Sequence, residues 1–184
     1  MRFPRGNKIA PQIRRDGDLA YIPLSGGFEA VIDADDIPLV SGRFWTARRR
    51  AKSDGSTATH YAHSRSLKTT LHRVIMGADH GEIIDHINSD GLDNRRKNLR
   101  KVNKSQNGAN SRMSENNTSG FKGVSPAQTG KWFVSIRLDC KTKYVGIYQD
   151  KIEAARAYDA AAVKAFGEFA LTNEAMGLLQ EGRS

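Results

Sequence analysis

The sequence predicts an α+β protein in which short strands outnumber helices. Runs of alternating apolar and polar residues, separated by glycine-rich or serine-rich turns, occur in pairs and are typical of antiparallel hairpins. One long alanine-rich segment, residues 152–166, carries apolar side chains at helical spacing. A length of 184 residues allows one medium domain or two small ones.

The N-terminal part is expected to consist mainly of strands that follow a flexible basic arm, residues 1–18. Residues 19–24 and 28–32 flank a Ser-Gly-Gly turn and are predicted to form a hairpin. Residues 33–36, of which three are aspartates, are predicted to begin a short helix, because carboxylates at a first turn meet unpaired backbone amides. The remaining predicted elements are a strand pair, 44–50 and 59–63, its connecting loop 53–56, and a short helix, 71–76, that ends at Gly77.

The central segment, about 82–113, carries the candidate chemistry. A strand at 82–85 is predicted to deliver Asp85 and His86 to its end, and residues 99–102 are predicted to return as a second strand. Asn103 is a good N-cap for a helix from residue 104, which would place Asn107 about one turn inside that helix. This strand, loop, strand, helix order would bring Asp85 and Asn107 together.

These residue types suit cleavage of a phosphodiester. Asp85 and Asn107 offer oxygen ligands, which favour Mg²⁺ or Mn²⁺ over zinc. Side chains alternate along a strand, so His86 would point away from Asp85 and face a water that it activates as a general base. Asn98 would hold the imidazole in the required tautomer through its side-chain carbonyl.

The C-terminal part is predicted to be a separate module. The polar stretch 114–119 lacks apolar residues and is predicted to be a linker. Residues 121–124, 131–137 and 143–148 are predicted to be three strands, followed by the helix 152–166 with Asp150 and Glu153 at its start. The module would cover 120–173, and 174–184 would be a tail.

The central segment resembles the HNH homing endonucleases, in the H-N-N variety common in phages. The resemblance is carried by Leu71-His72-Arg73, by the run from Asp85-His86 to Asp93-Asn94, by Asn98-Leu99-Arg100 and by Ser105-Gln106-Asn107. It implies a ββα-metal fold within a nuclease domain at 19–113. It also implies metal binding by Asp85 and Asn107, a base role for His86, and Asn98 as the middle Asn of the motif, with Asn94 as a rival for that position.

The C-terminal module resembles the AP2/ERF DNA-binding domain. The residues that carry the resemblance include Gly120-Phe121-Lys122-Gly123-Val124, Gly130-Lys131-Trp132, Gly146-Ile147-Tyr148 and the run 153–159. The family implies a three-stranded antiparallel sheet laid in the major groove and packed on one helix, with Trp132 and Tyr158 in the core. Plant members carry Arg, Arg and Trp where Ser125, Ala127 and Thr129 stand here, so their GC-rich target is not transferred.

The formal net charge of +9 indicates a polyanionic partner. The candidate DNA contacts lie in three groups: Arg48 and Arg50; Arg95, Arg96 and Arg100; and Lys131, Arg137, Lys141, Lys143 and Tyr144. For the first group and for the charged hairpin of the third, a solvated surface is the alternative. The chain lacks a long apolar run, no protein partner is implied, and the single cysteine, Cys140, fits a reducing cytoplasm, expected to be that of a bacterial host.

The sequence therefore predicts a metal-dependent endonuclease that cuts double-stranded DNA and is targeted by its C-terminal module. One alternative is a non-enzymatic DNA-binding regulator with an inactive HNH segment. A weaker one is an RNA-binding protein, against which we weigh the absence of an evident aromatic stacking pair on the exposed sheet.

Overall fold

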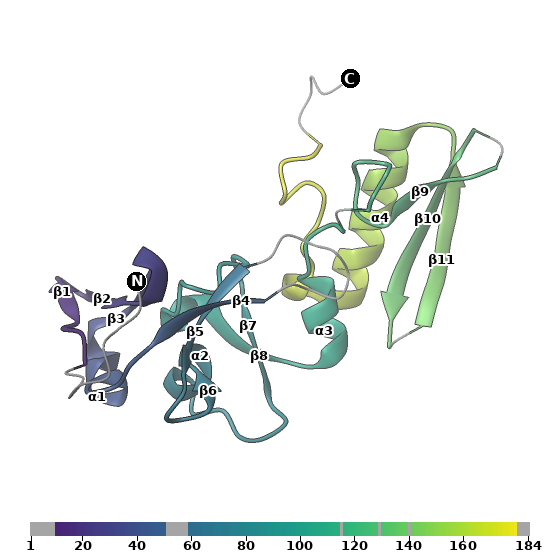
Figure 1. The fold of residues 1–184 in the computed structure, drawn as a ribbon. Helices are drawn as coiled ribbons and strands as arrows, with labels where there is room; N and C mark the ends of the chain where they lie inside the picture. The colour runs from purple at the N-terminus through teal and green to yellow at the C-terminus, as the bar shows by residue number, and fades with distance from the viewer. Residues whose placement is uncertain (1–9, 51–58, 115, 129, 140, 180–184) are drawn as a thin grey trace. The chain divides into compact units, whose positions relative to one another are not determined.

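The computed structural model describes residues 10–50, 59–114, 116–128, 130–139 and 141–179. The predicted loop 53–56, Cys140, Thr129 and the ends of the predicted arm and tail lie outside these residues. The protein has mixed α and β structure, with several small antiparallel sheets and few helices (Figure 1). It forms two compact units, of which unit 1 holds the described residues up to Val102 and unit 2 those from Asn103.

The described part of unit 1 is built on antiparallel strands. One sheet has the order β1-β2-β3 (Arg14–Asp16, Leu19–Pro23, Glu29–Asp33), another β4-β5-β6 (Thr46–Arg50, Thr59–Ser64, Thr69–Thr70), and the strands β7 and β8 (Ile83–His86, Leu99–Val102) form a pair. Short helices connect them: η1 (Ser25–Gly27), η2 (Ala34–Asp36), α1 (Ile37–Val40), α2 (Leu71–Ile75) and η3 (Arg96–Asn98).

Strand β1 corrects the expected extent of the N-terminal arm. Residues 14–16 were expected in a flexible arm, but they pair with β2, with Arg14 opposite Tyr21. The Arg14 guanidinium lies 4.1 Å from the centre of the Tyr21 ring and also contacts Glu29. The three residues contain no apolar side chain, so the strand depends on its partner and has no local hydrophobic pattern.

The core of unit 1 joins its sheets to the segment that carries the candidate chemistry. Ile32, Val40 and Leu71 are fully buried there, and Ile84 and Leu99 of β7 and β8 pack into the same cluster. A further link runs through the backbone, because the amide of residue 31 donates to the carbonyl of residue 92 at 2.9 Å, and residue 94 donates to the carbonyl of residue 31 at 2.8 Å. The loop after β7 is therefore fastened to β3.

Unit 2 contains a three-stranded antiparallel sheet with a long helix on one face (Figure 1). Its elements are α3 (Lys104–Ala109), β9 (Val124–Pro126), β10 (Trp132–Leu138), β11 (Lys141–Tyr148), α4 (Lys151–Phe166) and η4 (Gly167–Phe169), with β10 central in the sheet. The Asp150 carboxylate accepts a hydrogen bond from the amide of Glu153 at 2.7 Å, as expected for the N-cap of α4. Residues 121–123, predicted as strand, are instead a turn that buries Phe121.

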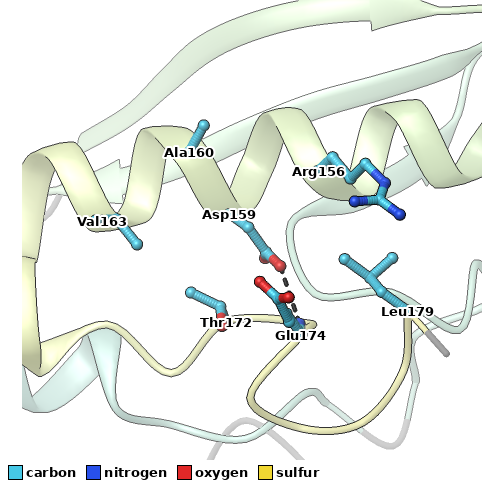
Figure 2. A pocket seen from close by; sticks show the side chains of 7 residues that line it. All are labelled: Arg156, Asp159, Ala160, Val163, Thr172, Glu174 and Leu179. Carbon is cyan, nitrogen blue, oxygen red and sulfur yellow. Dashed lines mark hydrogen bonds between the residues drawn. The ribbon is translucent and has the colours of Figure 1, made fainter.

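The C-terminal segment and α3 both pack within unit 2. The amide of Leu171 and the Lys122 ammonium group donate to the carbonyl of Ala109, which ties α3 to the rest of the unit. The division between units consequently falls after Val102, whereas the sequence placed it at 114–119. Figure 2 shows a groove between α4 and residues 172–179, in which the Asp159 carboxylate accepts a hydrogen bond from the amide of Glu174 at 2.9 Å.

Candidate active site

Asp85 and His86 are the last two residues of β7, and the pairing with β8 fixes their directions. Asp85 lies opposite Arg100, and His86 lies opposite Leu99. Burial alternates along β7, with Ile84 and His86 buried and Asp85 partly exposed. The two candidate residues therefore occupy opposite faces of the hairpin, as strand alternation requires.

The loop that follows His86 is held by the side chain of Asn98. Its Oδ1 accepts a hydrogen bond from the amide of Asn88 at 3.0 Å, and its Nδ2 donates to Asn88 Oδ1 at 2.9 Å and to the carbonyl of Asp93 at 2.7 Å. Two of these three bonds join the Asn98 side chain to the loop backbone, and the third joins it to the side chain of Asn88. These contacts show that Asn98 fixes the loop, and its role in orienting His86 through the side-chain carbonyl stays a prediction.

A side-chain oxygen of Asn94 contacts the His86 ring. Asn94 is fully buried, and its Nδ2 donates to the carbonyl of Leu92 at 2.9 Å and lies 3.5 Å from that of Gly91. Since two carbonyls fix the NH₂ end of this amide, Oδ1 must face the imidazole, and His86 Nε2 donates to it at 3.4 Å. The lone pair of a neutral His86 is then on Nδ1.

Burial lowers the pKa of the His86 imidazole below its ordinary value, since His86 is only 4% exposed. The hydrogen bond to Asn94 and the surrounding carboxylates, that of Asp85 first, act in the opposite direction. A buried imidazole with a lowered pKa is held in its neutral form at neutral pH, which is the form that accepts a proton.

Two further residues form an aromatic cluster with His86. The His72 ring meets the His86 ring edge-on with centroids 4.9 Å apart, and the Tyr61 ring lies 5.7 Å from His72 and 5.6 Å from His86. His72 Nε2 lies 3.0 Å from the hydroxyl of Thr70. His72 belongs to the Leu71-His72-Arg73 run that carries the resemblance, whereas Tyr61 was not singled out from the sequence, because only the fold brings β5 against these two histidines.

The predicted metal ligands belong to different units. Asp85 is in unit 1, where its Oδ2 accepts hydrogen bonds from Arg100 Nε and Nη2 at 3.2 and 3.1 Å. Asn107 is exposed on α3 of unit 2, one turn after the predicted N-cap, Asn103, whose side chain accepts from Gln106 at 2.8 Å. Their joint role in one metal site therefore stays a prediction.

The predicted arginine contacts of unit 1 have distinct surroundings. Arg95 donates to both carboxylate oxygens of Asp93 at 2.7 and 2.6 Å, and Arg96 donates to Asp36 at 2.7 Å. These pairs raise the pKa of both guanidinium groups and balance their charge locally. Arg48 is exposed and lies opposite Tyr61, so it shares a sheet face with the aromatic cluster.

The predicted contacts of unit 2 divide between the two faces of its sheet. Arg137 lies opposite Thr142, and Tyr144 lies opposite Ser135, on the face away from α4. Lys141 and Lys143 lie opposite Leu138 and Ile136, at register positions of the other face, and Lys131 precedes β10. The Arg50 side chain lies outside the described part of the structure.

The exposed face of this sheet also corrects the argument made against RNA binding. The rings of Phe133 and Tyr144 lie 5.5 Å apart and are inclined at 39°. An aromatic pair is thus present on the sheet, and its absence no longer weighs against binding of unpaired bases.

Comparison with known families identifies the segment that carries the site. Residues 70–109 match the family model of HNH endonucleases. The matched segment contains Asp85, His86, Asn94, Asn98 and Asn107, and it indicates a DNA-cleaving function of the nuclease type. Among the described helices, none is both long and apolar enough to cross a membrane.

Proposed function

We propose that this chain is a metal-dependent endonuclease of the HNH homing type that hydrolyses phosphodiester bonds in double-stranded DNA. The observation that carries the proposal is a buried imidazole, His86, at a strand end, oriented by Asn94 and adjacent to Asp85 on the opposite face. The family match over residues 70–109 supports the same chemistry. A phage origin and a bacterial host cytoplasm are the expected setting.

The residues fit a hard cation such as Mg²⁺ or Mn²⁺. In the described part of the chain, no three His, Cys, Asp or Glu residues form a metal-binding group. The single acidic ligand that we assign is Asp85. Mg²⁺ is commonly held by one or two carboxylates and keeps several waters and phosphate oxygens as ligands. When bound, the cation would supply neutralisation of charge on the scissile phosphate and the leaving oxygen. Asn107 is the second proposed ligand.

The protein's own residues then have the following roles. His86 Nδ1 accepts a proton from the attacking water while the water oxygen bonds to phosphorus and the bond to the leaving oxygen breaks. Asn94 fixes the ring through Nε2, and Asn98 fixes the loop that carries Asn94. Arg100 orients the Asp85 carboxylate. Unit 2 is proposed to bind the target, which raises the local concentration of DNA at the nuclease segment.

The test is conversion of supercoiled plasmid that contains native flanking DNA, in Mg²⁺ or Mn²⁺, by wild type, His86→Ala and His80→Ala. His80 is an exposed histidine near the same segment and serves as the matched control. We expect nicking or linearisation by wild type and His80→Ala, and loss of cleavage in His86→Ala. DNA binding by wild type without cleavage on several substrates would favour the regulator, and full cleavage by His86→Ala would refute the assignment of the base.

A further inference from the structure

The face of the β9–β11 sheet that points away from α4 has a composition unlike a solvated surface. Val134 and Ile136 of β10 are buried toward α4, so the alternate residues Phe133, Ser135 and Arg137 point outward. Residues directly opposite in an antiparallel pair share a face. The outer sheet face therefore also contains Ile147, Tyr144 and Thr142 of β11 and Ser125 of β9.

Large apolar groups are concentrated at one end of this outer sheet face. Ile147 is 49% exposed and lies opposite Phe133, and Tyr144, whose ring contacts Phe133, is 63% exposed. The core of unit 2 lies on the opposite face of the sheet, so these side chains have no packing role there. Exposed apolar groups that adjoin one another mark binding surfaces more often than scattered ones do.

The charge of the strands selects the kind of partner. Among the residues of β9, β10 and β11, Arg137 is the charged residue of the outer sheet face, and Lys141 and Lys143, at register positions of the other face of β11, are also cationic. The whole chain carries a net charge of +9, which disfavours a second copy of the same surface as the occupant. A polyanion that also presents apolar groups fits better, and duplex DNA meets that description through its phosphates and the methyl groups of thymine.

The order of residues along β10 sets the spacing of contacts. Arg137 lies at one end and Phe133 at the other, four residues away, and a strand rises about 3.4 Å per residue. The separation is roughly 14 Å, which corresponds to about four base pairs at the rise of B-DNA when the strand follows the groove. An arginine pairs bidentately with guanine, and an apolar side chain contacts the thymine methyl.

Building on the proposed role of unit 2 in target binding, we propose that the outer sheet face reads a mixed element in the major groove. A guanine contacts Arg137, and thymines about four base pairs away place their methyl groups against Phe133 and Ile147. Tyr144 packs between these two positions and keeps Phe133 facing the groove. This specificity differs from recognition of a purely GC-rich site.

The experiment compares two duplex pools of random sequence, one with thymine and one with uracil in its place, so that only the methyl group differs. The full chain carrying His86→Ala, which prevents cleavage, is used to select bound duplexes and then for anisotropy titrations of the selected sequence. Each buried methyl group is expected to contribute about fourfold in affinity. The protein with an unchanged sheet should select duplexes in which guanine and thymine lie about four base pairs apart. It should bind the same selected sequence more weakly when uracil replaces thymine.

Matched variants assign the effect to the face. In the same background, Ile147→Ala and Phe133→Ala should bind the thymine and uracil duplexes equally, while Val163→Ala should still discriminate between them. Val163 is also exposed and apolar, at 54%, but lies on α4. In a Trp45→Phe background, Trp132 fluorescence checks that each variant retains the fold of unit 2. Arg137→Ala should lose the guanine preference.

Other outcomes overturn the inference and are distinguishable from failure of the proposed function. Equal affinity for both pools, with binding weakened by Arg137→Ala, would refute thymine reading and leave DNA binding by unit 2 in place. Binding unaffected by Arg137→Ala and Ile147→Ala would refute both the inference and the proposed role of unit 2. Tighter binding to single strands than to duplex would show that the aromatic pair takes unpaired bases.

Discussion

The replacement Asn98→Ala should destabilise unit 1 far more than an ordinary loop substitution. The side chain is buried and makes three hydrogen bonds, two with Asn88 and one to the carbonyl of Asp93. Each such bond contributes about 1 kcal/mol net, and truncation leaves the amide of Asn88, which is part-buried, and the buried carbonyl of Asp93 without this partner. The expected loss is about 3 kcal/mol in the free energy of unfolding. Cleavage should fall as well, because the loop follows His86 directly.

The measurement is urea unfolding followed by tryptophan fluorescence. The chain has two tryptophans, Trp45 in the core of unit 1 and Trp132 in unit 2. In a Trp132→Phe background, Trp45 reports unit 1 alone, so the unfolding of the two units is not mixed in one signal. The midpoint should shift to lower urea with an unchanged slope, since the unfolded surface remains the same.

A double-mutant cycle with Asn88→Ala sharpens the test. One of the three bonds ends on the side-chain oxygen of Asn88, so the two substitutions should couple by roughly 1 kcal/mol. A loss of less than about 1 kcal/mol in Asn98→Ala alone would mean that water replaces these bonds. In that case the argument that Asn98 fixes the loop is wrong.

Three other predictions concern neighbouring features. Asp93→Asn should lower the stability of unit 1 at neutral pH. The hydrogen bond from Arg95 lowers the Asp93 pKa in the folded state. The stabilisation by the Asp93 carboxylate is therefore present above the unfolded pKa of about 4 and is lost as pH falls through the folded value. The urea midpoints of wild type and Asp93→Asn should consequently converge in acid. Gly123→Ala should lower the unfolding midpoint of unit 2 and leave that of unit 1 unchanged. Gly123 has a φ of +76°, and the added Cβ of alanine would overlap the Tyr158 ring. The tryptophan of each unit reports the result. Asp85→Asn should raise the Mg²⁺ concentration needed for half-maximal plasmid cleavage without weakening DNA binding in metal-free buffer, and an unchanged Mg²⁺ requirement would exclude Asp85 as a ligand.

Local patterns predicted those elements whose residues carry their own signal. The alternation of apolar residues located β2 and β3, and the caps Asn103 and Asp150 located the starts of α3 and α4. Strand β1 could not be located in this way, because its three residues are all charged and adopt the strand conformation through pairing with β2. The division into units after Val102 has no local signal either, since α3 is held by contacts to residues far along the chain.

The candidate site shows the same limit at the level of single residues. The sequence singled out Asp85 and His86 as neighbours, and a strand end was enough to predict their opposite directions. It left Asn94 and Asn98 as rivals, because both are amides in the same polar loop. The distinction depends on β3, whose residue 31 accepts a hydrogen bond from the backbone of Asn94 and so turns that side chain toward His86.

The distribution of charge fits a division of labour between the two units. Three of the arginines predicted to contact DNA, Arg95, Arg96 and Arg100, are paired with carboxylates of unit 1. These pairs balance the charge of the three arginines locally and so reduce the attraction that the same arginines exert on phosphates. The strands of unit 2 contain cations and no acid. A chain built this way is expected to hold its target chiefly through unit 2, so a modest nuclease site suffices once the DNA is tethered.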